Sequence, residues 1–284
     1  CDYGFGYDKD WVVLDTENDP DRDRYTRFVC DYKRPFVSIP APKGGRRYEF
    51  MLLEGETKEE VLKHSFLQEI LKPYRKELKE EDVTRAAVYH FSACVAERFS
   101  EGRVFLAGDS CHLTPPFAGQ GMNTGLRDAH NLAWKLERVV KGFSSLKLLD
   151  SYELERKKKV SEMVEFAVTL GEIVMPKTEL DSRVMSTVWK LAKLIPGAKD
   201  YIEKMKFKPK PHYEEGAFVF GESRLSSGQM LPQTFVETSD GNQVRLDELM
   251  GKSFALLGYG EETFETVRNF EHRLFPNLQK VYLK

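Results

Sequence analysis

The segment RVFLAGDSCHLTPPFAGQGMNTG at residues 103–125 carries the most specific structural signal in this chain. The apolar letters at 104–107 have the composition of a strand, and Asp109 follows the strand end as a hydrogen-bond acceptor. Pro115 and Pro116 fix φ in the loop behind it, and the glycines let backbone approach a flat partner. A helix begins directly afterwards, and its first N–H groups have no partner inside the helix. The stretch therefore predicts a strand, an acidic turn, a rigid loop and a helix whose positive end faces whatever the loop holds.

The residues before this stretch predict a largely antiparallel sheet. They form runs rich in β-branched and aromatic residues, separated by turn signals such as NDP at 18–20 and PKGG at 42–45. The expected strands are residues 11–15, 24–32, 36–39, 46–53 and 83–93, followed by 104–107.

Helical spacing of apolar residues predicts several helices. One covers residues 58–74, with Thr57 as its cap and Glu60 three residues later. A long helix begins near Met122 and stops at Gly142. The remaining expected elements are a helix over 146–170, a helix ending at 196–197, a connector at 206–212, and the start of a small α/β unit made of the segments 246–250 and 253–258, a helix near 262–274 and a strand near 280–283.

Composition excludes several classes of partner. The net charge of −2 provides no basic field for a nucleic acid, and no apolar run is long enough to span a bilayer. The four cysteines are scattered, without a C-x-x-C pair or a histidine spacing typical of zinc, so we expect no metal site. Reduced thiols and the lack of a secretory signal favour a cytoplasmic protein.

The 103–125 stretch resembles the second flavin-contacting motif of the FAD-dependent aromatic hydroxylases, the single-component flavoprotein monooxygenases. Four further segments resemble the branch that hydroxylates 3-(3-hydroxyphenyl)propionate and related phenols, and the resemblance covers roughly the whole chain. These segments are CDYKRP at 30–35, RRYEFML at 46–52, DAHNLAWKL at 128–136 and LDSYELER at 149–156.

The resemblance implies an α+β or α/β fold like that of para-hydroxybenzoate hydroxylase. We expect a substrate-binding sheet domain at 1–95, the second part of the FAD-binding domain plus a helical region at 96–225, and a truncated thioredoxin-like domain at 226–284. The G-x-G-x-x-G turn that binds the ADP half of FAD in this family is not in the sequence. We therefore expect a fragment without the N-terminal dinucleotide-binding part, which does not retain FAD by itself.

By resemblance, the loop supplies the contacts to the flavin. The backbone N–H groups of Gly121, Met122 and Asn123 face the negative charge of the reduced ring, and Asp109 holds the ribityl chain. Pro115 and Pro116 lie along the isoalloxazine ring near its oxygen-reacting face, which also makes Pro115 a catalytic candidate. Gly108 and Gly119 complete the expected cofactor-binding set.

The strand around residue 48 is where we expect the substrate. Period-two alternation puts Arg46, Tyr48 and Phe50 on one face and the residues between them on the other. We assign Arg46, Tyr48 and Phe50 to substrate binding. Surface cross-strand pairing explains Arg47 and Glu49 on the other face equally well, and half-buried aromatic residues are normal in a sheet.

A phenol becomes reactive when its proton is removed, so a base is needed near the substrate. Tyr89 and His90, on the strand at 83–93, are the candidates for this catalytic role. His112 follows the acidic turn and is either a proton relay or, more commonly for such a residue, a packed and hydrogen-bonded histidine. Asp128 and Asn131 are expected to brace the loop from the helix behind it.

The resemblance implies an NAD(P)H-dependent flavoprotein aromatic monooxygenase of phenol degradation. It would use FAD, O2 and transiently bound NADH or NADPH to hydroxylate a small phenolic substrate ortho to its hydroxyl through a flavin C4a-hydroperoxide. Another flavin enzyme on this scaffold, such as a halogenase or an alkene reductase, and a non-catalytic assembly subunit are the alternatives. The C-terminal tail has no cysteine pair, so we expect it to serve packing or homodimer formation.

Overall fold

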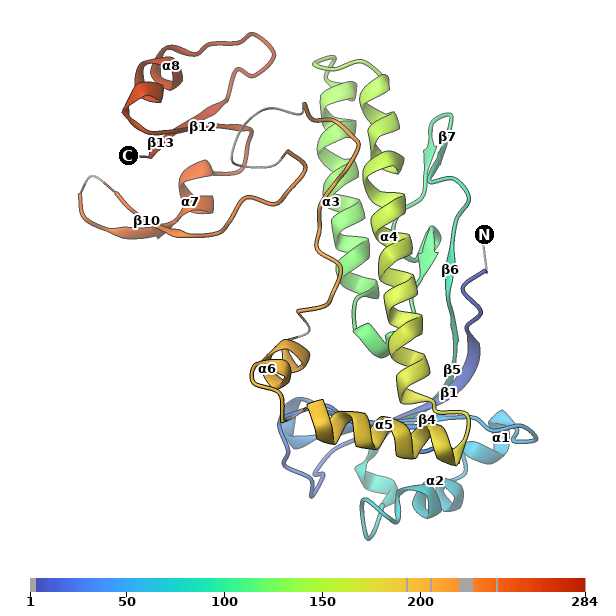
Figure 1. The fold of residues 1–284 in the computed structure, drawn as a ribbon. Coiled ribbons are helices and arrows are strands. Elements are labelled where there is room, and N and C mark those ends of the chain that lie inside the picture. Colours follow the sequence, from blue (N-terminus) through green and yellow to red (C-terminus); the bar gives the residue numbers. More distant parts are fainter. Residues whose placement is uncertain (1–3, 193, 205, 220–226, 239, 284) are drawn as a thin grey trace.

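The computed structural model describes residues 4–192, 194–204, 206–219, 227–238 and 240–283. A sheet with small helices forms one end of the molecule, two long helices rise from it, and a small C-terminal unit lies beside their far end (Figure 1). None of the helices in these ranges combines the length and the apolar composition that a membrane span requires.

The sheet has five strands in the order β2-β3-β4-β1-β5, and every neighbouring pair is antiparallel, which confirms the expected sheet. Its central strand β1 pairs with both β4 and β5, so Trp11 lies between Met51 and Tyr89. The strands are β1 (Asp8–Thr16), β2 (Arg27–Val29), β3 (Phe36–Pro40), β4 (Arg46–Met51) and β5 (Val83–Ser92).

Two short helices, α1 (Lys58–Val61) and α2 (His64–Leu71), cover one face of this sheet. A single helix over 58–74 was expected; the extended conformation of Lys63 divides it, and the second part ends before Pro73. The expected cap is confirmed, because the Thr57 hydroxyl accepts a hydrogen bond from the Glu60 backbone N–H. Both helices turn their apolar residues, including Leu67 and Leu71, onto the sheet.

The opposite face of the sheet packs against the loop that the sequence singled out. Trp11 and Tyr7 make edge contacts with Phe117 of the loop, each with ring centroids 5.6 Å apart. Val37 of β3 and Val174 at the end of a long helix belong to the same buried cluster. The five-stranded sheet and the loop thus share one hydrophobic core.

Short strand pairs tie the loop to the sheet. β6 (Cys94–Val95) continues from β5 and pairs antiparallel with β9 (His112–Leu113) in the loop. β7 (Ser100–Glu101) pairs with β8 (Val104–Phe105), which is shorter than the expected strand at 104–107. The turns η3 (Gly108–Ser110) and η4 (Pro116–Ala118) lie on either side of β9, and η1 (Pro42–Gly44) and η2 (Glu80–Asp82) are turns of the sheet region.

The long helices α3 (Gly121–Val140) and α4 (Lys147–Val174) lie side by side behind the loop (Figure 1). Gly142 follows the end of α3, where the helix was expected to stop, and its φ of 73° favours glycine. α4 runs beyond the expected residue 170 and ends just before Pro176.

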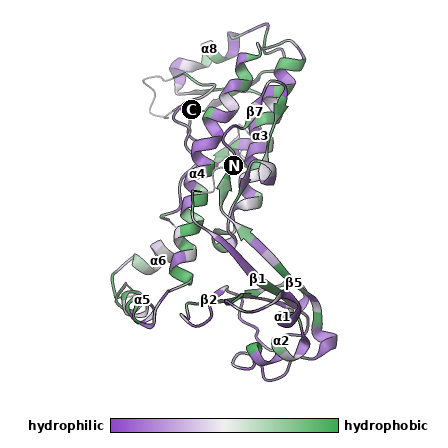
Figure 2. Ribbon diagram, turned by 90° about the vertical axis from the view of Figure 1, so that its right-hand side faces the viewer, coloured by the Kyte–Doolittle hydropathy of each residue, from purple (hydrophilic) through white to green (hydrophobic). Residues whose placement is uncertain are grey.

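After α4 the chain crosses to the sheet and then returns to the far end of the long helices. Figure 2 shows α5 (Glu179–Ala192) on one side of the sheet and α1 and α2 on the other. The remaining elements are α6 (Ala198–Glu203), the hairpin of β10 (Phe235–Glu237) and β11 (Gln243–Arg245), α7 (Leu246–Met250), β12 (Ala255–Tyr259), η5 (Glu261–Thr263), α8 (Phe264–Asn269) and β13 (Gln279–Leu283). β12 and β13 are parallel, so the expected small α/β unit is confirmed, although α8 is shorter than expected. The expected division at residues 95 and 225 stays a prediction.

Candidate functional site

The start of α3 presents uncapped backbone donors. Its first internal hydrogen bond is donated by Thr124 to Gln120 at 2.8 Å, and no side chain caps the helix. The N–H groups of Gly121, Met122 and Asn123 donate to no residue in the described ranges. A helix of 20 residues focuses positive potential at such an end, so this end suits a negatively charged group.

The loop in front of these donors leaves room for a flat ligand. A Cβ placed on Gly119 or Gly121 meets nothing within 4 Å. Gly119 has a φ of 58°, the left-handed conformation that turns the chain into the helix. Asp109 is exposed in η3 and forms no hydrogen bond or ion pair with a described residue, so its carboxylate is available to a hydroxyl-bearing ligand.

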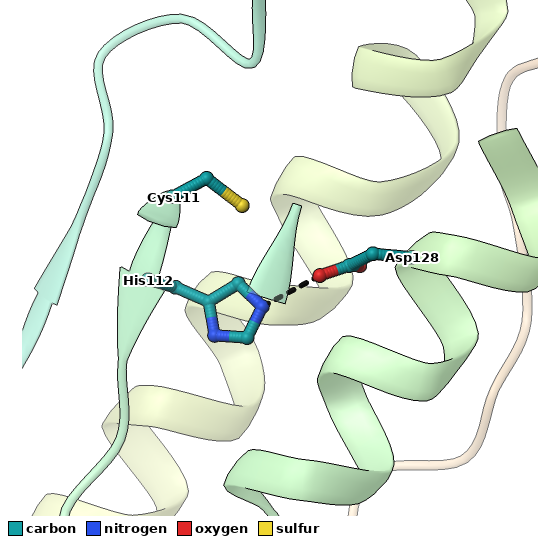
Figure 3. A group of neighbouring side chains, drawn as sticks. All are labelled: Cys111, His112 and Asp128. Carbon is teal, nitrogen blue, oxygen red and sulfur yellow. Dashed lines mark hydrogen bonds and ion pairs between the residues drawn. The ribbon is translucent and has the colours of Figure 1, made fainter. Parts of the chain in front are cut away.

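Asp128 holds the loop from behind, as expected (Figure 3). Its carboxylate accepts hydrogen bonds from Arg156 Nε of α4 at 2.7 Å and from the Gly108 backbone N–H at 3.1 Å, and His112 Nε2 lies 2.7 Å away. Burial raises the pKa of the Asp128 carboxyl, but His112 and Arg156 outweigh burial and the net pKa is lowered. Since Asp128 is therefore ionised, Nε2 of His112 carries a proton, and its buried Nδ1 has no partner among the described residues.

The cluster of Cys111, His112 and Asp128 has donor atoms within 4.8 Å of one another, which is also the spacing of a metal site (Figure 3). Its chemistry opposes a cation. Burial raises the pKa of the Cys111 thiol to about 12, and the Arg156 guanidinium already neutralises the carboxylate. The cluster therefore acts as an ion-paired brace. His112 is packed and bonded in it, the commoner of the two roles expected for this residue.

Asn131 was expected to brace the loop, but its side chain contacts Glu155 of α4 instead. Its side-chain amide donates to Glu155 at 2.5 Å, and Lys135 donates to the same carboxylate oxygen at 2.7 Å. Glu155 also accepts the Ala217 backbone N–H at 2.7 Å. Asn131 thus joins α3 to α4 and to a later segment, while Asp128 alone of the expected pair touches the loop.

The prolines precede Phe117, the loop residue that packs on the sheet. Pro115 is buried and Pro116 is half-buried, and between His112 and Pro115 lies the Thr114 hydroxyl, a buried oxygen without a partner in the described residues. A buried hydroxyl without a partner in the same loop that leads to the open start of α3 fits a ligand with polar ring edges, as an isoalloxazine has. The sequence analysis missed Thr114, since a lone threonine in a loop carries no signal by itself.

The structure places Arg46, Tyr48 and Phe50 away from the loop. All three point to the face that α1 and α2 cover, and each is about 1% exposed. Arg46 pairs with Asp21 at 3.0 Å, and the Tyr48 hydroxyl donates to Asp19 at 2.7 Å. These side chains build the core of the sheet domain, so the assignment of substrate binding to this face is corrected.

The alternate residues of β4 face the loop instead. Glu49 lies between Val13 and Val37 on this face and is 7% exposed, yet its carboxylate forms no hydrogen bond or ion pair with a described residue. Burial raises its pKa, against the nearby Arg47, which pairs with Asp15. Neither of its oxygens is among the buried atoms that lack a hydrogen-bond partner, so its burial is not evidence of a missing ligand; a carboxyl on this face can still accept a ligand's hydrogen bond. Alternation put Glu49 on the face opposite Tyr48, where surface pairing with Arg47 was an equally good explanation, so the sequence did not single it out.

Tyr89 and His90 point to opposite faces of the edge strand β5. Tyr89 lies beside Trp11 on the loop-facing side and stacks on Phe91 with centroids 6.1 Å apart. His90 lies on the other side, where its Nδ1 is 2.8 Å from Asp10, and the hydrogen bond to Asp10 raises the pKa of this exposed histidine. The structure brings only Tyr89 to the face that holds Glu49.

Comparison with known proteins places this site in a family. Residues 22–167 match the family described as FAD binding domain, and residues 228–284 match the HcaD C-terminal domain. A 3-(3-hydroxy-phenyl)propionate/3-hydroxycinnamic acid hydroxylase of Burkholderia cenocepacia is 39% identical over 249 residues, which cover 88% of this chain and 46% of that protein. The corresponding hydroxylase of Klebsiella pneumoniae is 38% identical over 252 residues. The chain spans about half the length of these curated relatives.

Solved structures show the same fold. A ternary complex of aklavinone-11 hydroxylase with FAD and aklavinone superposes with a TM-score of 0.73 at 21% identity, over 97% of this chain and 52% of that one. p-Nitrophenol 4-monooxygenase from Pseudomonas putida gives a TM-score of 0.60 at 24% identity, over 70% of this chain and 51% of that one. The fold and the sequence agree: this chain belongs to the FAD binding domain family, and the relatives and solved structures that it resembles include proteins named as hydroxylases.

Proposed function

We propose that this chain forms the flavin-facing and substrate-facing part of an NAD(P)H-dependent monooxygenase that hydroxylates a phenolic acid ortho to its hydroxyl. The observation that carries the proposal is the uncapped start of α3, with three free backbone donors opposite an exposed Asp109. Backbone donors stabilise negative charge without giving up a proton.

The reaction balances with one molecule of each reactant. One atom of O2 enters the ring as a hydroxyl group and the other leaves as water, while NAD(P)H supplies two electrons and a proton accompanies them. When bound, FAD supplies the electron transfer and the activation of O2. The protein contributes binding, orientation and charge stabilisation.

The loop residues hold the cofactor in this proposal. The N–H groups of Gly121, Met122 and Asn123 bind the polar edge of the flavin ring, and the Asp109 carboxylate accepts hydrogen bonds from the ribityl hydroxyls. The remaining residues of the set, Gly108, Gly119, Pro115 and Pro116, shape the loop, with Pro115 against the reacting side of the ring. Asp128 and Arg156 fix this loop without touching the flavin.

The substrate ring lies against the loop-facing side of the sheet. There the Glu49 carboxyl, on the loop-facing side of β4, accepts the hydrogen bond of the phenol hydroxyl. Removing the phenol proton, or weakening its bond to the phenol oxygen, makes the ring electron-rich and so more reactive. Tyr89, on the same face, packs beside the ring; the relatives named for 3-(3-hydroxy-phenyl)propionate suggest a phenol with a carboxylate side chain.

The test joins the chain to a dinucleotide-binding N-terminal domain from a relative and measures NAD(P)H oxidation with a panel of phenols. We expect oxidation to be stimulated by 3-(3-hydroxyphenyl)propionate, with the 2,3-dihydroxy product detected by mass spectrometry. The matched 3-phenylpropionate, which has no phenol hydroxyl, should give no hydroxylated product. A protein that binds FAD yet hydroxylates none of the phenols would overturn the proposed activity.

A further inference from the structure

A second cavity lies at the other end of α3, between this helix and the C-terminal unit. Its volume is about 470 Å³, within the range of small-molecule sites. Trp134 and Arg138 of α3 form one wall, and Phe254 and Phe275 of the C-terminal unit form the other. Trp134 and Phe254 meet edge to face with centroids 5.5 Å apart, so the two walls are in contact.

Arg138 is a buried cation without an anion. It is 8% exposed and forms no ion pair with a described residue, and its one hydrogen bond, to the Phe143 carbonyl, is 3.5 Å long. Its neighbour Glu137 also lines the cavity; the ion pair with Lys141 at 2.5 Å is the main cause of the lowered pKa of the Glu137 carboxyl, and the charge of Arg138 contributes to it. Because Glu137 is engaged by Lys141, Arg138 keeps most of its N–H donors without a hydrogen bond to a described residue.

The aromatic rings around Arg138 hold it in place. Its guanidinium lies 4.6 Å from the centroid of Phe275, 5.0 Å from Phe143 and 5.3 Å from Phe254. These contacts orient the group but do not neutralise it. Lys252, on the C-terminal unit, adds another positive charge to the lining.

We propose that this cavity binds a small aromatic carboxylate, with its carboxylate on Arg138 and its ring between Trp134 and Phe275. A planar carboxylate matches the fork of the guanidinium with two parallel hydrogen bonds. Trp134 and the phenylalanines supply a flat apolar surface that a bare inorganic anion does not need.

The site is separate from the flavin loop. Arg138 lies sixteen positions beyond Met122 on the same helix, which at 1.5 Å per residue is about 24 Å. The inference therefore does not depend on the proposed hydroxylation, and its test needs no flavin. An aromatic acid bound here bridges α3 and the C-terminal unit, so it stabilises their contact.

The experiment titrates the 284-residue chain with 3-phenylpropionate by calorimetry and by tryptophan fluorescence. We expect saturable binding, about tenfold or more tighter than that of the uncharged 3-phenylpropionamide. Trp134→Phe should abolish the fluorescence change while calorimetric binding remains, which locates the ligand. Arg138→Gln should weaken binding about tenfold or more, whereas Arg183→Gln, at an exposed arginine of α5, should leave binding unchanged.

Each other outcome counts against the inference. Equal binding of acid and amide, unchanged binding in Arg138→Gln, or no binding at all overturns it. Inorganic phosphate binding as tightly as 3-phenylpropionate would show an oxyanion site without aromatic recognition and would overturn the ligand class. If Arg138→Gln does not fold, Lys252→Glu, at an exposed position, is expected to weaken binding severalfold, and unchanged binding contradicts the proposal.

Discussion

Asp128 of α3 and Arg156 of α4 are joined by a hydrogen bond of 2.7 Å from the guanidinium Nε, and both side chains are buried. The same carboxylate binds His112 and the backbone of Gly108, so one ion pair fixes both the packing of the long helices and the position of the flavin loop. The geometry of the loop therefore depends on Asp128, which does not contact the flavin in the proposed complex.

Asp128→Asn should destabilise the protein and loosen the loop together. The amide keeps the shape but leaves Arg156 as a buried, uncompensated charge, which costs about 3–5 kcal/mol. Chemical denaturation gives the free energy of unfolding, and Asp150→Asn, at an exposed position of α4, is the control. A variant as stable as the parent would show that the ion pair does not hold the loop.

Asp128→Asn should also change how the stability of the protein depends on pH. The pKa of Asp128 is lowered in the folded protein, so its contribution to stability is present above the unfolded value of about 3.9 and is lost as the pH falls through the folded pKa. The parent should therefore lose more stability than Asp128→Asn between neutral pH and the acid limit. Parallel melting curves across that range test this, and equal slopes would contradict it.

Glu49→Gln should raise the stability of the protein at high pH while lowering its activity. The buried carboxyl has a raised pKa, so the folded state binds the proton more tightly and stability falls as the pH rises from about 4.3 through the folded value. The neutral amide avoids this cost, and the variant should melt at a higher temperature than the parent at pH 8, with the difference shrinking towards pH 4.

In the chain joined to a dinucleotide-binding domain from a relative, Glu49→Gln should lower kcat/KM for a phenol about tenfold or more, the scale of one charged hydrogen bond. The rise of kcat/KM with pH through the raised pKa should disappear as well. Glu54→Gln, at an exposed position of the same segment, should change neither quantity. Unchanged activity and an unchanged pH profile would remove Glu49 from the substrate site.

Two glycines of α3 should respond differently to alanine. A Cβ on Gly121 meets nothing within 4 Å, so Gly121→Ala should stabilise the helix by up to about 1 kcal/mol while hindering the flavin. A Cβ on Gly125 would lie 3.2 Å from the Cα of Gly108, so Gly125→Ala should push the loop from the helix and lower both stability and FAD affinity. In the chain joined to a dinucleotide-binding domain, thermal melts without FAD measure the opposite effects on stability, and FAD titration measures the affinity. A parent-like FAD affinity in Gly121→Ala would mean that Gly121 has no ligand beside it.

The sequence predicted the elements whose signal is local. The helix from Met122 to Gly142, the Thr57 cap and the antiparallel order of the early strands each follow from spacing, caps and turn residues, and each is present. The break of the helix at Lys63 was not predicted, because no proline or glycine marks it and only packing of both halves on the sheet favours it.

The choice of sheet face was beyond the sequence. Alternation on β4 separates Tyr48 from Glu49, but both faces of this strand are buried, so periodicity cannot tell the core from the ligand side. The sequence also could not show that Arg138 is buried without an ion pair to a described residue, because this follows from the packing of the C-terminal unit against α3. Charges that lack a partner are a property of the assembled structure.

The central claim is that the loop around Asp109 binds the flavin, and the dissociation constant of FAD tests it most directly. In the chain joined to a dinucleotide-binding domain, Asp109→Ala should lose about 1.5–3 kcal/mol of FAD binding, as expected for a hydrogen bond that involves a charged group. Asp240→Ala, an exposed aspartate in the C-terminal unit, should bind FAD like the parent. An unchanged FAD dissociation constant in Asp109→Ala would contradict the account.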